Sequence, residues 1–227
     1  MTTSLVRDVI LRDGSALRLR SPAPADEAAI RAFFDGLRPE SRYMRFHGHG
    51  RTDIVARDYA SADGDTRVAM LAHLGERVVA VAGYDRLNEP GVAEVAFAVA
   101  DDLHGRGLAT RLLEQLAGVA AERGLRRFDA EVMADNRAML GVFASAGFDV
   151  RRQSAFGEAH VELDIRPSER LEERIAERDH RAAVVSLRPL LHPASVGSSA
   201  PRRGRATPAP SCSDGSSPRA SPAWRRR

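Results

Sequence analysis

The chain has 227 residues, 43% of them hydrophobic, which is enough for one generous domain or for one domain and a tail. None of its apolar runs approaches the roughly 20 residues of a membrane span, Met1–Arg12 lacks the pattern of a signal peptide, and the single cysteine, Cys212, excludes an internal disulfide framework and a cysteine-based zinc cluster. The net charge of +3 is uneven, because residues 197–227 hold seven arginines against one acid (+6), so that residues 1–196 carry −3. We expect a cytoplasmic protein with no membrane partner.

The first half of the chain predicts antiparallel strands and amphipathic helices. The β-rich run Val9–Arg20 surrounds Asp13-Gly14, a typical hairpin turn, and Glu27–Leu37 has apolar residues at helical spacing. His47-Gly-His-Gly50 predicts a loop, and its two histidines would suit a metal only with a third ligand, which is not spaced nearby; we therefore favour a solvated loop and expect no metal. The other elements predicted here are helices over Pro39–Phe46 and Thr52–Ala62 and strands over Arg67–Leu74 and Arg77–Tyr84.

The central stretch, Ala93–Leu113, combines a strand, a glycine turn and the start of a helix. The predicted strand Val92–Ala100 carries one carboxylate, Glu94, and the turn Gly105-Arg106-Gly107 leads into the predicted helix Leu108–Arg123. Such a turn presents free backbone N–H groups and the positive end of a helix dipole, which suits a phosphate or pyrophosphate. The remaining predicted elements are the strand Arg126–Met133, the helix Asn136–Ala146 and the strands Phe148–Gln153 and Ala159–Ile165.

The order of these elements predicts the fold class. Antiparallel hairpins precede a strand–helix–strand–helix unit, which indicates an α/β (α+β) fold with a mixed, mostly antiparallel central sheet and helices on both faces. A doubly wound dinucleotide fold is not expected, because only the middle of the chain alternates strands and helices.

Two motifs at their correct separation carry a family resemblance. A Gly-x-Gly turn alone is a weak signal, but here it lies between a predicted strand and a predicted helix. The run His104–Ala109 matches the phosphate loop (Gln/Arg)-x-x-Gly-x-(Gly/Ala) of the GNAT superfamily of acyl-CoA-dependent N-acyltransferases. Asn136, followed seven residues later by Phe143 and then by Gly147-Phe148, is similar to the second signature of that superfamily. The resemblance covers about Val9–Ile165, so we expect a GNAT domain over residues 1–165.

The resemblance implies acetyl-CoA as the co-substrate and a position for it. The pantetheine would run along Phe97–Val99, where the strand separates from Arg126–Met133, and the pyrophosphate would lie on the amides of Gly105–Thr110. In the family, the second helix also lines the acceptor channel, and this chain has Tyr43 and Arg45 there. The residues expected to contact acetyl-CoA are Phe97, Ala98, Val99, His104, Gly105, Arg106, Gly107, Leu108, Ala109, Thr110, Asn136 and Phe143.

Two positions depart from the family pattern. His104 stands where Gln or Arg is usual, and we expect weakened rather than lost affinity because main-chain N–H groups carry most of the binding. Phe143 stands where many members place a tyrosine that protonates the departing thiolate. Either water or another group supplies that proton, or the thiolate leaves unassisted, which its low pKa permits.

Glu94 carries the hypothesis about catalysis. A lysine-type amine has a pKa of about 10.4, so it arrives protonated at neutral pH and needs a base before it can attack a thioester. Ala93–Phe97 resembles the Ala-Glu-Ile-x-Phe strand on which protein acetyltransferases of this superfamily hold a glutamate base. The alternative is a carboxylate at a strand edge that merely faces solvent.

The C-terminal segments predict a linker and a tail. Arg166–Ala183 is charged and helix-like, and we expect it to be solvated; Leu187–Val196 looks like the linker that leads into the CoA-binding domain of ADP-forming acyl-CoA synthetases, to which some bacterial lysine acetyltransferases are fused. Residues 166–196 are therefore expected to be a charged linker and 197–227 a disordered basic Arg/Pro/Ser/Ala tail. Two interpretations of the tail stay open, an out-of-frame remnant of a longer fused protein and a basic arm, although Trp224 is its only aromatic residue and we do not expect a nucleic-acid partner.

Together these features predict an N-acetyltransferase that moves an acetyl group from acetyl-CoA to an amine by direct attack, with Glu94 as the base. The linker resemblance favours a protein lysine, on an acyl-CoA synthetase for example, as the acceptor. The alternatives are a small-molecule amine acetyltransferase and, from a different class, a non-catalytic acyl-CoA-sensing module.

Overall fold

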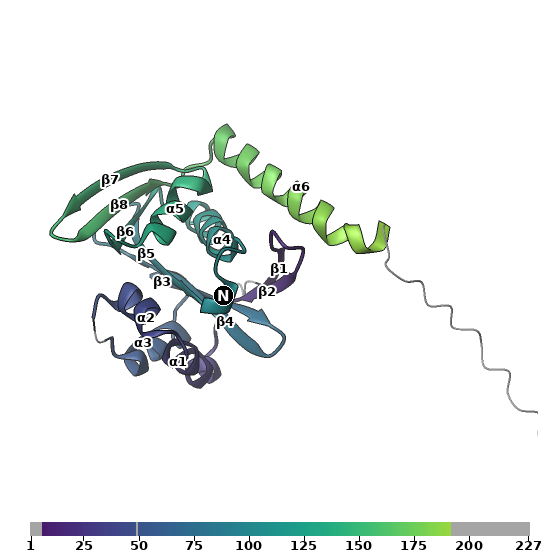
Figure 1. Cartoon of the computed structure of the whole chain (residues 1–227). Helices are drawn as coiled ribbons and strands as arrows, with labels where there is room; N and C mark the ends of the chain where they lie inside the picture. The colour runs from purple at the N-terminus through teal and green to yellow at the C-terminus, as the bar shows by residue number, and fades with distance from the viewer. Residues whose placement is uncertain (1–5, 49, 192–227) are drawn as a thin grey trace, which may run out of the picture. The chain divides into compact units, whose positions relative to one another are not determined.

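The computed structural model describes residues 6–48 and 50–191, so the predicted tail over 197–227 lies outside the described residues. Eight strands form one sheet in the order β1-β2-β3-β4-β5-β6-β8-β7 (Figure 1). Among these eight described strands only β5 and β6 pair in parallel, which confirms the predicted mixed, mostly antiparallel sheet. The strands are β1 (Val6–Ile10), β2 (Ala16–Arg20), β3 (Arg67–Leu74), β4 (Arg77–Arg86), β5 (Val92–Val99), β6 (Arg127–Met133), β7 (Asp149–Ala155) and β8 (Glu158–Asp164).

Helices cover both faces of this sheet, as predicted (Figure 1). The helices α1, α2 and α3 lie on one face, and α4 and α5 lie on the other. No helix in the described part of the chain is long and apolar enough to cross a membrane. The helices are α1 (Glu27–Asp35), α2 (Pro39–Phe46), α3 (Thr52–Ala60), α4 (Leu108–Glu122), α5 (Arg137–Ala146) and α6 (Glu169–Leu191), with short 3-10 turns at Pro24–Asp26 and Asp101–Leu103.

Alternation along β5 separates a core face from a polar face. Val95 and Phe97 are buried on the side of α4 and α5, whereas Glu94 is exposed on the side of α2 and α3. The predicted apolar spacing of α4 is confirmed, because Leu112 and Leu116 are fully buried beneath it. Successive side chains of β5 therefore point alternately to the helix layer of α4 and α5 and to that of α2 and α3, and Glu94 points to the second.

The parallel pair β5–β6 opens beyond its first residues. Pairing joins Val92–Glu94 to Arg127–Asp129, although β5 continues to Val99 and β6 to Met133. Each strand keeps its antiparallel neighbour on the other side, β4 for β5 and β8 for β6. The result is a gap in the ladder, with one unpaired backbone edge of β5 directly before the glycine turn.

Helix α6 differs from the expected solvated segment. It continues past Pro189 to Leu191 rather than ending near Ala183, and no proline or glycine interrupts it between Glu169 and Arg188. Its side chains are mostly exposed, but Leu171 and Ala182 are buried. Residues 166–191 are therefore largely a helix that packs on the domain, and the C-terminal part of the linker predicted up to residue 196 lies outside the described residues.

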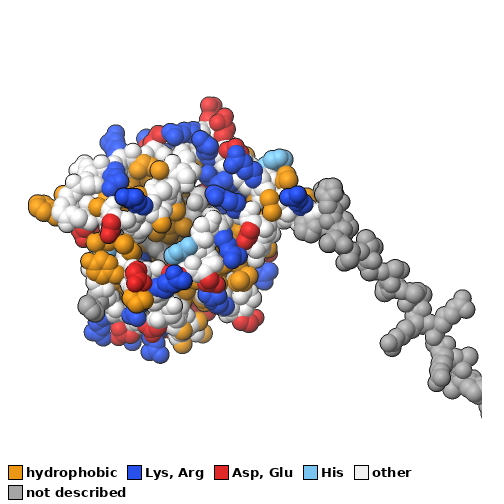
Figure 2. Space-filling model, viewed as in Figure 1, with side chains coloured by type: hydrophobic (Ala, Val, Ile, Leu, Met, Phe, Trp, Pro, Cys, Tyr) orange, Lys and Arg blue, Asp and Glu red, His pale blue; other side chains and the backbone are white. Residues whose placement is uncertain are grey.

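Charged side chains are spread over the surface. On the face shown in Figure 2, arginines and acidic side chains are interspersed. Many of them form ion pairs at short range, such as Arg18 with Asp8 (3.0 Å) and Arg77 with Asp102 (2.7 Å). Such exposed pairs contribute little to stability, so the fold depends chiefly on its apolar core.

Candidate functional site

The loop before α4 leaves backbone N–H groups without partners. Gly105 (φ +75°) and Gly107 (φ +86°) adopt left-handed backbone conformations, which a residue with a Cβ adopts only at an energetic cost. Arg111 N–H donates to the Gly107 carbonyl (3.1 Å), the first bond of the helix, so the N–H groups between them have no carbonyl from a preceding turn. These are the N–H groups of Leu108, Ala109 and Thr110.

The space beside this loop is free of protein. No described atom lies within 4 Å of a Cβ built on Gly105 or Gly107. The side chains of Leu108 and Thr110 are buried, so only their backbone groups can face a ligand. Unpaired N–H groups at a helix N-terminus beside open space can bind an anion, and we call this group the anion cradle. That it binds a pyrophosphate stays a prediction.

The open edge of β5 leads to this cradle. Ala100 N–H donates to the Val79 carbonyl of β4 (2.8 Å). Successive residues of a strand point their N–H and C=O groups to opposite edges. Because Ala100 points to β4, the backbone groups of Ala98 also point to β4, and those of Phe97 and Val99 point toward β6. Of the three residues predicted to accompany a pantetheine arm, Phe97 and Val99 therefore turn their peptide groups toward the open edge.

His104 and Arg106 are held by the protein itself. His104 Nε2 lies 2.9 Å from the Val99 carbonyl, so this hydrogen bond takes up one of the acceptors on the open edge. The Arg106 guanidinium pairs with Asp13 in the β1–β2 turn (3.1 Å). Both side chains fix the loop against neighbouring elements, and its backbone N–H groups remain available.

Asn136 and Phe143 have clear structural roles. The Asn136 side chain caps α5 by accepting a hydrogen bond from Met139 N–H (3.0 Å). Phe143 is buried, and its ring meets that of Phe97 edge-on, with the centroids 6.1 Å apart. The second signature therefore anchors α5 against β5, and Phe143 places an apolar edge where a tyrosine would bring a hydroxyl.

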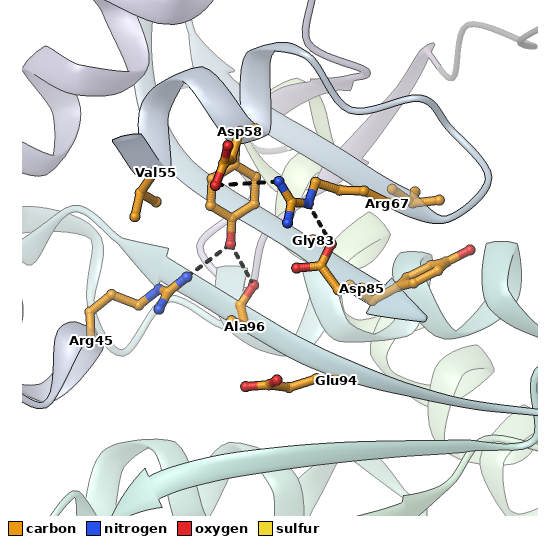
Figure 3. Close-up of a pocket in the computed structure, with 11 residues that line it drawn as sticks. Arg45, Val55, Asp58, Arg67, Gly83, Asp85, Glu94 and Ala96 are labelled. Carbon is orange, nitrogen blue, oxygen red and sulfur yellow. Dashed lines mark hydrogen bonds and ion pairs between the residues drawn. The ribbon is translucent and has the colours of Figure 1, made fainter. Parts of the chain in front are cut away.

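A pocket of about 170 Å³ lies on the other face of β5, between the strands and the helices α2 and α3 (Figure 3). It is bounded by residues of α2, α3, β3, β4 and β5, and both positive and negative side chains line it. Glu94 enters it from β5 together with Ala96, two positions along the same face. Its polar lining consists mainly of Arg45, Asp58, Tyr59, Arg67, Asp85 and Glu94.

The acidic side chains of this pocket differ in their partners. Arg67 pairs with Asp85 (2.5 Å) and with Asp58 (3.4 Å), so one guanidinium is the counter-charge of both carboxylates. Glu94 is exposed and forms neither a hydrogen bond nor an ion pair with any described residue. It is therefore the free carboxylate of the pocket, available to accept a proton from a bound amine.

The two predicted acceptor residues of α2 separate in the structure. Arg45 lines the pocket, and its Nη2 donates to the Tyr59 hydroxyl (2.9 Å). Tyr43 is 48% exposed and does not line this pocket. Sequence reasoning missed Tyr59, Arg67 and the two paired aspartates, because they come from separate elements and belong to no motif. The one available signal was the register of a hairpin that sets Arg67 opposite Asp85.

The predicted histidine loop lies only partly within the described residues. His47 ends α2 in a left-handed conformation (φ 52°), with its Nδ1 3.4 Å from Glu158. The second histidine, His49, lies outside the described residues. Within 6–48 and 50–191, no group of three or more His, Cys, Asp or Glu side chains is placed to hold a metal ion.

Gly107→Ala is expected to raise the KM for acetyl-CoA about tenfold and to cost about 1 kcal/mol of stability. Its positive φ disfavours alanine, and relaxing that strain moves the N–H groups at the start of α4. The matched control is Gly118→Ala, on the exposed side of the same helix. It should raise the free energy of unfolding by at most about 1 kcal/mol and leave the KM unchanged. Steady-state kinetics and thermal unfolding measure both; an unchanged KM in Gly107→Ala would show that the loop does not hold the pyrophosphate.

The sequence and the fold are similar to those of known acetyltransferases. The profile of the family described as the acetyltransferase (GNAT) family matches residues 30–148. An acetyltransferase of Pseudomonas aeruginosa, PA5475, is 32% identical over 144 residues, which cover 61% of this chain and 77% of that protein. The acetyltransferase Pat of Mycolicibacterium smegmatis is 38% identical over 76 residues, 34% of this chain but only 22% of Pat. The crystal structure of the GNAT domain of S. lividans PAT is 36% identical, with a TM-score of 0.64, 70% of this chain covered and 96% of that domain.

Proposed function

This chain belongs to the acetyltransferase (GNAT) family and is an acyl-CoA-dependent acetyltransferase, and we propose that it moves an acetyl group from acetyl-CoA to a lysine side chain of a protein, with Glu94 as the base. The single observation that carries the proposal is the position of Glu94. It is a free carboxylate in a pocket on one face of β5, and the open edge of the same strand leads to the anion cradle.

The proposed acetyl-CoA site follows from the unpaired backbone groups. The N–H groups at the start of α4 would hold the pyrophosphate, and the peptide groups of Phe97 and the N–H group of Val99 would pair with the pantetheine amides. The thioester would then reach the part of β5 that also carries Glu94. Backbone donors suit this task because they are fixed by the fold and are placed before the ligand arrives.

The proposed reaction needs one base and no covalent enzyme intermediate. Glu94 removes a proton from the lysine ammonium, directly or through a water, and the free amine attacks the thioester carbonyl. The carbon–sulfur bond breaks, the amide nitrogen loses its second proton to solvent, and the thiolate takes up a proton. Since Phe143 has no hydroxyl, the thiolate leaves without a tyrosine; a thiol pKa near 8.5 makes it an adequate leaving group.

A protein acceptor is supported by two similarities. The Glu94 strand is similar to that of protein acetyltransferases of the superfamily, and two of the relatives carry the names Pat and PAT. The pocket also lies at the surface, between helices α2 and α3 and the sheet, where a side chain of a folded partner can enter.

The test is acetyl-CoA turnover by the full chain with a panel of lysine-bearing proteins, an acyl-CoA synthetase among them, against free amines such as spermidine. Release of the CoA thiol and the mass of the acceptor are both measured. We expect an acetylated lysine on at least one protein and slower turnover of every free amine. Turnover of free amines alone would replace the proposal by a small-molecule acetyltransferase, and binding of acetyl-CoA without any turnover would favour a sensor module.

A further inference from the structure

Arg45 is the unpaired cation of the pocket. Its Nε is buried without a hydrogen-bond partner, and the guanidinium forms no ion pair with any described residue. The other pocket arginine, Arg67, already pairs with two aspartates. The pocket thus contains one free anion, Glu94, and one free cation, Arg45, on facing elements (Figure 3).

The guanidinium is also held in place. Arg45 Nη2 donates to the Tyr59 hydroxyl (2.9 Å), which in turn lies 3.4 Å from the Ala96 carbonyl on β5. The carbon of the guanidinium is 5.2 Å from the centre of the Phe46 ring. A charge tethered in this way is a recognition group rather than a mobile surface arginine, because its orientation is set before a ligand binds.

Tyr59 reaches this position because β4 has a glycine beneath it. A Cβ on Gly83 would lie 2.7 Å from Tyr59 Cε1 and 2.6 Å from the Val68 carbonyl. The ring therefore occupies space that any other residue would fill, and it is 9% exposed. Gly83, Tyr59 and Arg45 form a chain of contacts from the sheet to the charged group.

We propose that this pocket selects acceptor lysines that have a carboxylate beside them, with Glu94 receiving the ammonium and Arg45 receiving the carboxylate. A guanidinium with free donors pairs best with a planar carboxylate. A lysine next to an aspartate or glutamate supplies an ammonium for Glu94 and a carboxylate for Arg45. Tyr59 acts as the positioning residue for Arg45. This inference rests on the proposed transfer to protein lysines and names the class of sequence that is acetylated.

The test compares two fluorescent peptides that differ only in the residues flanking one lysine, Asp-Lys-Asp and Asn-Lys-Asn. Their dissociation constants are measured on the full chain with saturating CoA, and their acetylation is measured with acetyl-CoA. We expect the wild type to bind the aspartate peptide about tenfold more tightly, as one charge-assisted pair allows. In Arg45→Gln the ratio should fall to about one, and in Tyr59→Phe to an intermediate value with an unchanged Tm. Arg42→Gln, on the same helix and outside the pocket, should keep the wild-type ratio.

Each outcome decides the question. Equal affinity of the two peptides for the wild type, an unchanged ratio in Arg45→Gln, or no measurable binding of either peptide overturns the inference. A retained preference without acetylation of either peptide would instead contradict the proposed transfer reaction and leave the recognition by Arg45 standing. If Arg45→Gln does not fold, the wild-type ratio and Tyr59→Phe still give the answer.

Discussion

Glu94→Gln is expected to lower kcat for acetyl transfer by about 10²- to 10⁴-fold while the dissociation constant of acetyl-CoA stays within about twofold of the wild-type value. The amide has the shape of the carboxylate but cannot accept the ammonium proton. Because Glu94 has no partner among the described residues, the substitution breaks no ion pair and the fold should be unaffected. The acetyl-CoA cradle depends on backbone groups of the loop before α4, which the variant does not touch.

The measurements are CoA-thiol release and calorimetric binding of acetyl-CoA. The matched control is Glu131→Gln, which removes a carboxylate on β6 that pairs with His160 (2.6 Å) and lies outside the pocket; it should keep the wild-type kcat. The deficit of Glu94→Gln should shrink as the pH approaches about 10, where the lysine amine loses its proton unaided. A kcat within threefold of the wild type at neutral pH would show that Glu94 is only a solvent-facing carboxylate.

The second large effect concerns stability and lies in the contact between α6 and α4. The Glu114 side chain on α4 is 1% exposed, and it pairs with Arg111 (3.0 Å) and with Arg178 of α6. Arg178 also donates to the carbonyls of Ser145 (3.2 Å) and Ala146 (2.7 Å) at the end of α5. One arginine therefore joins α6 to both helices on that face of the sheet.

Arg178→Met should lower the free energy of unfolding by about 3 kcal/mol, because it leaves a buried carboxylate with one counter-charge and two helix-end carbonyls without donors. For a domain of this size the Tm should fall by roughly 6–12 °C. Arg181→Met is the matched control on the same helix; it removes only an exposed pair with Glu177 (2.5 Å) and should cost less than about 0.5 kcal/mol. Thermal and urea unfolding of the full chain measure both.

A double variant, Glu114→Met with Arg178→Met, should recover most of this loss, because it removes the buried charge together with its partner and leaves Arg111 paired with Asp179 (2.6 Å). If the double variant is no more stable than Arg178→Met, the lost carbonyl contacts rather than the unpaired charge explain the effect. A change below 0.5 kcal/mol in Arg178→Met would mean that the contacts of Arg178 with α4 and α5 do not stabilise the domain.

The stability of Arg178→Met should depend on pH in a defined direction. Burial raises the pKa of Glu114, and the neighbouring arginines partly oppose this shift. A carboxyl whose pKa is higher in the folded state favours folding when it is protonated, so its penalty is absent below the unfolded pKa of about 4.3 and grows as the pH rises through the folded value. Loss of Arg178 removes a charge that lowers this pKa. The deficit of the variant relative to the wild type should therefore shrink as the pH falls from 7 to about 4.

The local features of the site were predictable from the sequence alone. Gly105 and Gly107 mark a turn with positive φ, and the apolar spacing from Leu108 onward marks the helix that follows, so the anion cradle is encoded within a few consecutive residues. The alternation in β5 likewise sets Glu94 on the face opposite Phe97. These are short-range rules of backbone geometry, and they need no knowledge of the partners.

The pairing of side chains was decided only by the tertiary structure. Apart from the hairpin register that sets Arg67 opposite Asp85, nothing in the sequence indicates that Arg67 also pairs with Asp58 while Glu94 stays free. Nor does it indicate that Tyr59 holds Arg45, because only the packing of α2 and α3 on the sheet brings these residues together. From the sequence, the charged segment after Ile165 is expected to be a solvated helix. In the structure its Arg178 pairs with the buried Glu114, 64 positions earlier in the chain. Local periodicity determines which face of an element is apolar, but the energy of a buried charge depends on the charge that folding places beside it.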